Sequence, residues 1–305
     1  MKTPVLHQPA AITLTDKKAA NCYSNIKDYY NIAGPDYEAW SKNFNMHFGY
    51  CKRPADIFNL EKMLYRMNDE VLSRLKIDTE RVNSIVDLGC GAGTVARYTA
   101  QQYPTTKITG VTIVDFQITK GRELINNAGL TERVQLIKDN FENISFEDES
   151  FDRAYAVESA CHASGSNKEL FIKEMARILK TGGNFCIADG FLKHDTNLPW
   201  LFNKIYKKII NCWALPCFGN INEFTAALKK YGLQQIKVEE ISLRIAPSVA
   251  YVPYTCFKFF IQELWKHKTI RLKKERWNNV YAPLLGMILG LYRKHFGYYI
   301  ISGVK

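Results

Sequence analysis

Apolar residues in the first quarter of the chain follow helical spacing. Within 56–76 they recur every three or four positions, which predicts one amphipathic helix, at Leu60, Met63, Leu64, Met67, Val71, Leu72 and Leu75. Residues 21–45 are rich in aromatic side chains and are interrupted by Gly34-Pro35, so we expect two short helices there. Residues 1–20 are expected to form a loose arm.

From residue 84 onward, short β-rich runs alternate with helical segments. The expected strands are 84–88, 107–113, 134–137, 151–157 and 184–188. The expected helices are 94–103, 116–127 and 168–179, and Gly182-Gly183 is expected to stop the last of these. This alternation is typical of the α/β class, in which a parallel sheet carries helices on both faces.

The alternation breaks down after Gly190. A helix over 222–231 and strands over 235–244 and 298–304 are still expected, separated by irregular stretches over 191–218 and 246–294. A strand at the end of the chain would complete the sheet, so we interpret 246–294 as an inserted lid.

The expected organisation is therefore effectively a single domain. A helical N-terminal cap covers 1–80 and precedes a core over 81–305. Lid insertions in this core are expected at about 191–221 and 246–294.

Basic residues are concentrated in the last third of the chain. Residues 1–190 hold 23 Lys and Arg against 24 Asp and Glu, whereas residues 191–305 hold 18 against 6. Such asymmetry indicates an anionic partner, but no nucleic-acid-binding motif accompanies the charge, which disfavours nucleic acid. The alternatives are a membrane surface contacted by a basic amphipathic helix, the phosphates of a prenyl diphosphate substrate, or a solvated face with extended lysines. No feature indicates an oligomeric state.

The cysteines and the apolar runs bear on the compartment. The eight cysteines form no C-x-x-C pair, which is typical of reduced thiols in an intracellular protein, and the N-terminal residues show no signal peptide. The longest apolar run, 280–292, is too short to span a bilayer. We expect a cytoplasmic protein, with peripheral attachment to a membrane as an alternative.

A glycine-rich loop marks the candidate ligand site. The run Val-Asp-Leu-Gly-Cys-Gly-Ala-Gly at 86–93 follows an expected strand and opens a helix. Its G-x-G-x-G spacing differs from the dinucleotide fingerprint, and no G-K-[ST] follows, which excludes a phosphate-binding P-loop. Glycines at such a turn let a ligand approach the backbone beside the free N–H groups of a helix N-terminus.

This loop resembles the first motif of the class I S-adenosylmethionine-dependent methyltransferases. The resemblance extends over 81–190, through KDNFENISFEDESFDRAYAVESACHA and ARILKTGGNFCIADGF, although Thr181 replaces the usual proline. AVESACHA and the NFNMHFGY segment at 43–50 are similar to the sterol, tocopherol and terpenoid C-methyltransferase branch. The resemblance implies a Rossmann-like, doubly wound, seven-stranded sheet whose last strand is antiparallel.

The resemblance also implies which residues bind the cofactor, S-adenosyl-L-methionine. Asp87 is expected near its amino-acid end, and the second strand carries Thr112 where an acid is usual, so Thr112 would hold the ribose with help from Gln117. Ordinary strand-end and helix roles for these two remain an alternative. The expected cofactor-binding residues are Asp87, Gly89, Cys90, Gly91, Gly93, Thr112, Ile113, Gln117, Asp139, Asn140 and Phe141.

Candidate catalytic residues follow the fourth expected strand. Glu158 and His162 would share one side of a helical turn if one begins there, with a salt-bridged or capping pair as the structural alternative. His47 lies in the aromatic N-terminal segment. We expect Tyr29, Trp40, Phe48 and Tyr50 to contact substrate, although plain helix packing is the favoured role for any single aromatic residue of this region. The tetrapeptide His-Phe-Gly-Tyr occurs at 47–50 and again at 295–298, in different surroundings.

These residues suit methylation of an alkene carbon in an apolar terpenoid, prenyl or sterol-like molecule. Aromatic faces and Glu158 would stabilise the carbocation, and His162 or His47 would remove the proton. The alternatives are O- or N-methylation of a phenolic or prenylated aromatic molecule, and a module that binds the cofactor without catalysis. No metal-ligand cluster is apparent, so no metal is expected.

Overall fold

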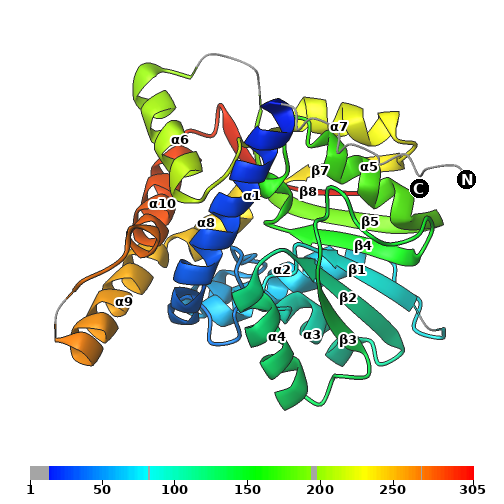
Figure 1. The fold of residues 1–305 in the computed structure, drawn as a ribbon, viewed down its shortest axis with the longest axis horizontal. Helices are drawn as coiled ribbons and strands as arrows, with labels where there is room; N and C mark the ends of the chain where they lie inside the picture. The colour runs from blue at the N-terminus through cyan, green and yellow to red at the C-terminus, as the bar shows by residue number, and fades with distance from the viewer. Residues whose placement is uncertain (1–13, 82, 194–197, 269) are drawn as a thin grey trace, which may run out of the picture.

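The computed structural model describes residues 14–81, 83–193, 198–268 and 270–305, with side chains described from Tyr23 onward. In this part of the chain eight strands form one sheet, which can be followed by its strand labels in Figure 1. The strands are β1 (Asn83–Leu88), β2 (Thr106–Thr112), β3 (Val134–Lys138), β4 (Phe151–Val157), β5 (Leu179–Leu192), β6 (Gly219–Asn220), β7 (Gln234–Glu240) and β8 (Phe296–Val304).

The strand order is β3-β2-β1-β4-β5-β8-β7, with the two-residue β6 paired to β5. Strands β1 to β5 pair in parallel, and β8 lies antiparallel between β5 and β7. The main path therefore has the expected seven strands with the last one antiparallel, and β6 is an addition that the sequence pattern did not predict. The α/β, doubly wound class is confirmed.

Helices cover both faces of the sheet. The helices are α1 (Leu14–Ala33), η1 (Gly34–Ala39), η2 (Pro54–Phe58), α2 (Leu60–Arg74), α3 (Thr94–Gln102), α4 (Asp115–Asn127), η3 (Ala160–His162), α5 (Glu169–Ile178), α6 (Trp200–Cys212), α7 (Ile221–Lys230), α8 (Ser242–Val249), α9 (Val252–His267) and α10 (Lys274–Leu291), with η marking 3₁₀ helices. One core packs α5 and α7 on the sheet, and the other packs α2, α3 and α4 on its opposite face.

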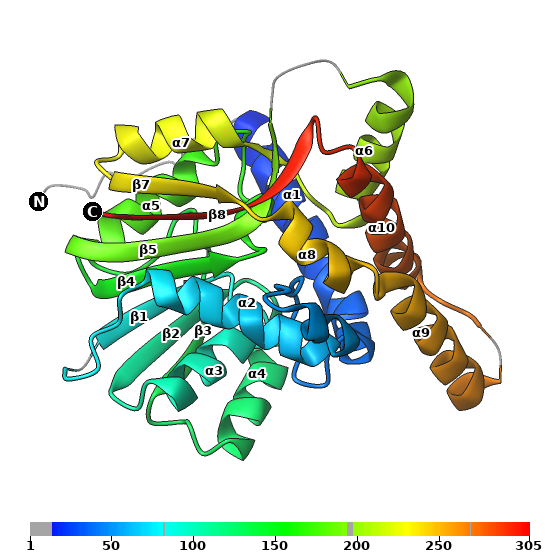
Figure 2. The ribbon, with the colours of Figure 1, turned by 180° about the vertical axis from the view of Figure 1, so that it is seen from behind.

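A helical layer covers one end of the sheet. Figures 1 and 2 show α1, α6, α9 and α10 beside the carboxyl ends of the parallel strands. A third apolar cluster, built around Ile209, Leu289 and Phe296, joins α6 and α10 to the start of β8. This layer places helical side chains next to the strand ends where ligands bind in open α/β sheets.

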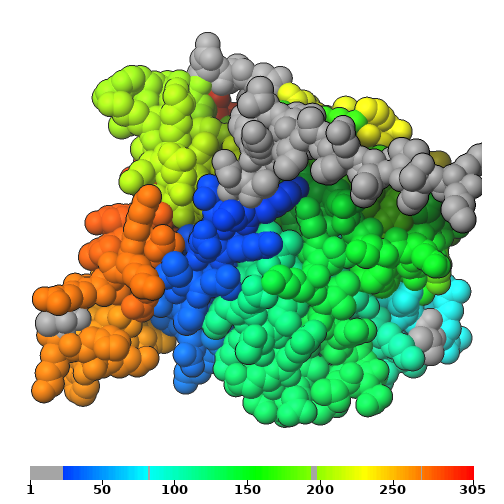
Figure 3. Space-filling model, in the orientation of Figure 1, coloured from blue at the N-terminus to red at the C-terminus, as the bar shows by residue number. Residues whose placement is uncertain are grey.

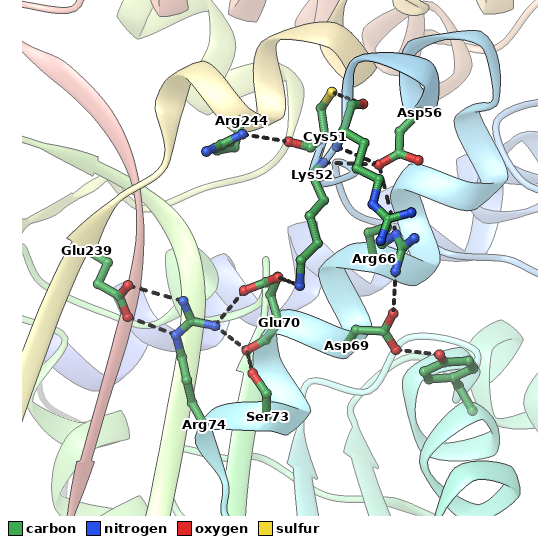
Figure 4. Close-up of polar contacts among 12 residues, drawn as sticks. Cys51, Lys52, Asp56, Arg66, Asp69, Glu70, Ser73, Arg74, Glu239 and Arg244 are labelled. Atoms are coloured by element: carbon green, nitrogen blue, oxygen red, sulfur yellow. Dashed lines mark hydrogen bonds and ion pairs between the residues drawn. The ribbon is translucent and has the colours of Figure 1, made fainter.

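Polar contacts attach α2 and the segment before it to β7 and α8 (Figure 4). The Arg74 guanidinium of α2 pairs with Glu239 of β7 at 2.9 Å, and the backbone N–H of Cys51 donates to Arg244 O on α8 at 2.8 Å. Deeper in the protein, the Gly49 N–H donates to Ser248 Oγ at 2.9 Å. These contacts fix the position of the segment that contains His47 and Phe48.

Three sequence expectations are corrected by the structure. β7 ends at Glu240, and α8 replaces the expected strand end because Ile245 follows helical spacing and packs on the second core. β5 begins at Leu179 and runs through Gly182-Gly183, so the α5 helix ends before these glycines and not at them. Residues 14–20 belong to α1 and are no loose arm, while 1–13 lie outside the described residues. The cap and lid boundaries remain predictions.

Candidate active site

The glycine loop adopts a conformation that only glycine tolerates well. Gly89, Gly91 and Gly93 have φ angles of +84°, +52° and +70°, the left-handed region that other residues rarely occupy. A Cβ on Gly89 would also collide with the Ser159 side chain. The loop is held in place because the N–H groups of Gly89 and Cys90 both donate to Val111 O at 2.9 Å.

A cavity of about 850 Å³ lies over this loop, at the carboxyl ends of β1, β2 and β4. Its lining includes ten of the eleven expected cofactor residues: Asp87, Gly89, Cys90, Gly91, Thr112, Ile113, Gln117, Asp139, Asn140 and Phe141. Gly93 lies outside the lining and caps the N-terminus of α3. We call this space the loop cavity.

The carboxyl group of Asp87 is suited to bind a positively charged group. It is buried, and its Oδ2 has no hydrogen-bond partner among the described residues. Burial raises the pKa of this carboxyl to about 7, against a smaller opposing effect from the neighbouring Tyr155 hydroxyl. An ammonium group, such as that of an amino acid, would satisfy both the free oxygen and the charge.

The polar residues at the end of β2 are joined to each other. Thr112 Oγ1 donates to Gln117 Oε1 at 2.6 Å, and the same hydroxyl accepts the Val114 N–H at 3.2 Å. Gln117 Nε2 lies 4.0 Å from the sulfur of Met46. Hydroxyl and amide groups therefore line the loop cavity where the sequence predicts a ribose site.

The carboxylate of Asp139 is occupied by hydrogen bonds within the turn after β3. Its two carboxylate oxygens accept the N–H groups of Asn140 and Ser145, at 2.7 and 2.8 Å. Asn140 Oδ1 in turn accepts the Glu142 N–H at 3.0 Å. These bonds shape the turn after β3, which presents Phe141 to the cavity.

A second cavity, of about 1120 Å³, lies on the other side of Glu158 and is mostly apolar and aromatic. We call it the aromatic cavity. η1, η3, α9, α10 and β8 contribute to its lining, which includes Tyr30, Tyr37, Trp40, Phe48, Trp213, Phe218, Val252, Phe259, Val280 and Tyr298. Its charged or titratable lining residues are Asp36, His47, Glu158, Cys161, His162 and Asp189, besides the tyrosines and Cys256.

The two cavities meet at five residues that line both of them: Tyr30, Met46, His47, Glu158 and His162. The three expected catalytic residues are thus brought together at the junction, although His47 lies more than 100 positions from Glu158 and His162 in the sequence. A ligand group over the glycine loop and one among the aromatic side chains would meet here.

Glu158 is held rigidly at the junction. Its φ of +49° is unusual for a residue with a side chain, and its Oε1 accepts the Phe48 N–H at 2.6 Å and the Tyr298 hydroxyl at 2.8 Å. Burial, together with the nearby Asp189 carboxylate, raises the pKa of Glu158 to about 8, against the two hydrogen bonds that lower it. The carboxyl is therefore poised to gain or lose charge near neutral pH.

Both histidines at the junction are neutral at pH 7. Burial lowers the pKa of His47 to about 4 and that of His162 to about 3. His47 Nδ1 donates to Phe48 O at 2.9 Å, while His162 Nε2 and the Tyr30 hydroxyl lie 3.0 Å apart. His162 ends the three-residue η3, so the expected helical i, i+4 relation to Glu158 is wrong, yet both side chains reach the junction.

The structure brings only two of the four expected substrate residues to the aromatic cavity. Trp40 and Phe48 line it, with their rings edge to face at 5.9 Å. Tyr29 is buried in packing, where its hydroxyl donates to Asn279 Oδ1 at 2.9 Å. Tyr50 packs on the core under α2, beneath the Arg244 guanidinium. Tyr29 and Tyr50 therefore do not line the cavity.

Several residues that line the aromatic cavity were not predicted from the sequence. Tyr298, whose hydroxyl holds Glu158, ends the second His-Phe-Gly-Tyr copy, and that repeat was the one available signal for it. Met46 lies in the 43–50 segment but was not singled out there, whereas Trp213 and Phe218 come from a segment with no motif, so only the folded chain places them at the site.

Comparisons with known proteins agree with this geometry. Residues 85–183 match the family model described as "Methyltransferase domain". Methyltransferase GfsG of Streptomyces halstedii is 26% identical over 266 residues, covering 87% of this chain and 92% of that protein. Sterol 24-C-methyltransferase ERG6 of Saccharomyces cerevisiae is 27% identical over 241 residues, covering 77% of this chain but only 60% of the yeast protein.

A solved structure shares the fold at low identity. It is the geranyl diphosphate C-methyltransferase from Streptomyces coelicolor A3(2), in complex with Mg²⁺, geranyl diphosphate and S-adenosyl-L-homocysteine. The TM-score is 0.68 at 15% identity, with 93% of this chain and 98% of that chain covered. These matches support a class I S-adenosylmethionine-dependent methyltransferase that is similar to the sterol C-methyltransferase branch, with S-adenosyl-L-methionine as the cofactor.

Proposed function

We propose that this enzyme methylates an alkene carbon of a neutral, apolar small molecule of the terpenoid, prenyl or sterol-like kind. The observation that carries the proposal is the junction, where a glycine-loop cavity opens onto an aromatic cavity beside a buried carboxyl. The names of the yeast sterol 24-C-methyltransferase and the geranyl diphosphate C-methyltransferase support transfer to carbon.

The residues of the loop cavity fit S-adenosylmethionine, which supplies an electrophilic methyl group on a sulfonium. The unpartnered Asp87 carboxylate would accept the ammonium of its amino-acid part. Gly89, Cys90 and Gly91 would present backbone to it, with Gly93 fixing the helix start behind them. Thr112 and Gln117 would face the ribose.

The far end of the loop cavity suits the base of the cofactor. Asp139 and Asn140 would hold the turn after β3, and Phe141 and Ile113 would pack beside the adenine. The roles of these residues rest on the family resemblance and on their shared position along the cavity.

The aromatic cavity is suited to a positively charged intermediate. Methylation of an alkene leaves a carbocation on the substrate, and the faces of Tyr30, Trp40 and Phe48 would each stabilise it by roughly 0.5–2 kcal/mol. The ionised form of Glu158 would add an opposing charge at the junction. Its raised pKa falls once a cation is near, because an opposite charge favours the carboxylate.

Proton removal completes the reaction and needs only a weak base. A proton next to a carbocation is strongly acidic, so the neutral imidazole of His162 would suffice despite its low pKa. The Tyr30 hydroxyl, 3.0 Å from His162 Nε2, would orient the ring. His47 lies at the same junction and is the alternative acceptor.

The lining favours a neutral substrate over a diphosphate. Among the described residues that line the aromatic cavity none is Lys or Arg, whereas Asp36, Glu158 and Asp189 are acids. A further apolar space of about 1160 Å³ between α6, α8, α10 and β8 shares Phe48, Trp213 and Tyr298 with it. Together these spaces would admit a molecule with a long apolar body.

A specific observation also favours a second candidate, O-methylation of a phenol. The pKa of Glu158, about 8, lies only about two units below that of a free phenol, so full proton transfer to it would cost about 3 kcal/mol. The histidines, with pKa values near 3 and 4, are much poorer bases for this purpose.

The deciding experiment incubates the purified enzyme with methyl-labelled S-adenosylmethionine and four substrate classes: sterols, free prenyl alcohols, prenyl diphosphates and prenylated phenols. We expect labelled products from neutral apolar alkenes, with the label on carbon. A label found only on oxygen or nitrogen would contradict the proposal and select the second candidate. If the enzyme methylated only prenyl diphosphates, the proposal that the substrate is neutral would be contradicted.

A further inference from the structure

Helix α9 is apolar on two opposite faces, although only one of them is covered. One face, with Val252, Thr255, Cys256 and Phe259, lines the aromatic cavity. The opposite face carries five large apolar or aromatic side chains that are exposed by 40% or more: Tyr254 at 63%, Phe257 at 65%, Ile261 at 40%, Leu264 at 44% and Trp265 at 84%.

The exposed side chains form one continuous stripe. Their spacing of three, four, three and one residues places them within about a third of the helix circumference. A helix that is apolar all round is normally buried in a core or a membrane. An exposed stripe of this size, with two aromatic residues more than 60% exposed and a tryptophan at 84%, therefore indicates a surface that something else covers.

Basic side chains continue from the end of this stripe. Residues 266–274 contain five Lys and Arg and no acid, and those residues are Lys266, Lys268, Arg271, Lys273 and Lys274. All five are exposed, and the exposed Ile270 lies among them. Figure 3 shows α9, in orange, projecting from the body of the molecule at one end.

The positive charge of this surface distinguishes between two candidate partners, a second copy of the chain and an anionic lipid membrane. A second copy would bring the same five basic side chains against each other, and their repulsion opposes a symmetric contact. The acid nearest in sequence to the stripe, Glu263, is buried and already pairs with Arg276 at 2.8 Å. An anionic lipid surface, in contrast, attracts the basic cluster and accepts the apolar stripe into its interface.

We propose that the outer face of α9, together with the basic residues 266–274, docks this enzyme on anionic lipid membranes. The inference goes beyond the proposed reaction and holds for any substrate. Because the inner face of the same helix lines the aromatic cavity, docking would hold that cavity next to the bilayer, where apolar molecules are dissolved.

The test is co-sedimentation of the full chain with phosphatidylcholine vesicles that contain or lack phosphatidylserine. We expect binding to the phosphatidylserine vesicles, weak binding to phosphatidylcholine alone, and release by added salt. The apolar variant Phe257→Ser/Trp265→Ser and the charge variant Lys266→Glu/Lys273→Glu should each lower the partition coefficient by about tenfold or more.

Two matched controls isolate the surface. Phe58→Ser/Leu170→Ser removes exposed apolar side chains on η2 and α5, and Lys173→Glu/Lys229→Glu makes the same charge change on α5 and α7. Both controls should bind like the wild type. Absence of wild-type binding, full binding by either test variant, or equal loss in the controls would overturn the proposal. So would a wild-type dimer that Phe257→Ser/Trp265→Ser converts to a monomer, because a second copy would then cover the stripe.

Discussion

Glu158 shows how one residue takes its chemistry from its surroundings. Its sequence neighbours explain only that it follows a strand, whereas its pKa of about 8 comes from burial between two cavities and from Asp189. The partners that hold it, Phe48 and Tyr298, lie 110 and 140 positions away. The position of this residue was predictable from the motif, but its environment was not, because long-range contacts create it.

Removing the charge of Glu158 tests its role at the junction. Gln keeps the size and an oxygen that accepts the Phe48 N–H and the Tyr298 hydroxyl, so the fold should be unchanged. We expect Glu158→Gln to lower kcat by about 10²–10³, measured with saturating cofactor. Tyr298→Phe, which removes one hydrogen bond but no charge, is the control and should cost much less. A Glu158→Gln enzyme with near-normal kcat would show that the carboxylate charge is dispensable.

Cofactor binding should depend on pH through the same carboxyl. Below about pH 8 Glu158 is protonated and neutral, and above it the carboxylate attracts a sulfonium. The affinity for S-adenosylmethionine, divided by that for S-adenosylhomocysteine, should therefore rise with pH up to about pH 8 and then level off, because the bound sulfonium lowers the pKa of Glu158. The ratio cancels the titration of Asp87, since both ligands carry the same ammonium group.

Calorimetric titrations at several pH values measure this ratio. Glu158→Gln should leave it flat over the same range. A wild-type ratio that is constant with pH would mean that Glu158 does not face the sulfur of the bound cofactor.

At the scale of elements, periodicity predicted the parts of the sheet that are buried on both faces. β4 matches its expected bounds and β1 differs by one residue, because continuous apolar runs and the glycine loop mark them clearly. The pattern failed at Ile241–Ile245, where an alternating run turns into α8 because Ile245 packs on the core and Leu243 faces solvent. In this segment tertiary packing, and not the local alternation of apolar residues, determines that the chain is helical.

The turn that carries His162 depends on a lysine that the sequence did not mark. Lys168 is fully buried, and its ammonium donates to Cys161 O, Ala163 O and Cys217 O at 3.0, 2.7 and 2.8 Å. We expect Lys168→Met to lower the free energy of unfolding by about 3 kcal/mol or more, because three buried carbonyls lose their donor. Urea denaturation measures the change.

Lys173→Met, on the exposed side of α5, provides the matched control and should change stability by less than about 0.5 kcal/mol. Equal stability of the two variants would mean that the carbonyls find other donors and that Lys168 does not hold the turn.

At the scale of the whole molecule, ion pairs join the N-terminal helices to the helices that cover the aromatic cavity. The Arg276 guanidinium of α10 contacts Asp36 of η1 and Glu263 of α9, each at 2.8 Å, and Asp36 also lines the cavity. The loop cavity, by contrast, is built mainly from the sheet and its loops. The two ligand sites therefore rest on different parts of the molecule.

Removing the ion pairs of Arg276 should weaken the binding of substrate without weakening the binding of cofactor. We expect Arg276→Ala to raise KM for the apolar substrate by about tenfold while the Kd for S-adenosylmethionine changes little. Steady-state kinetics and calorimetry measure the two quantities. Arg122→Ala, on α4 beyond the cavity, is the control. Equal weakening of both ligands by Arg276→Ala would contradict the separation.

The excess charge of the last third was visible in the sequence, but its arrangement was not. The composition predicted a basic, aromatic region, and only the helical bounds of α9 show that its apolar side chains lie on two opposite faces. No described helix is long and apolar enough to cross a membrane. What the region contacts depends on which side chains the fold leaves exposed, and a linear pattern does not contain that information.

Methyl transfer to carbon at the junction of the two cavities can be tested by locating the transferred methyl group in the product. The enzyme is incubated with ¹³C-methyl S-adenosylmethionine and a neutral apolar alkene that it turns over, and the product is examined by NMR. We expect a methyl resonance in the aliphatic range, coupled to the carbon skeleton of the former alkene. A methyl resonance in the range of methoxy or N-methyl groups would contradict it.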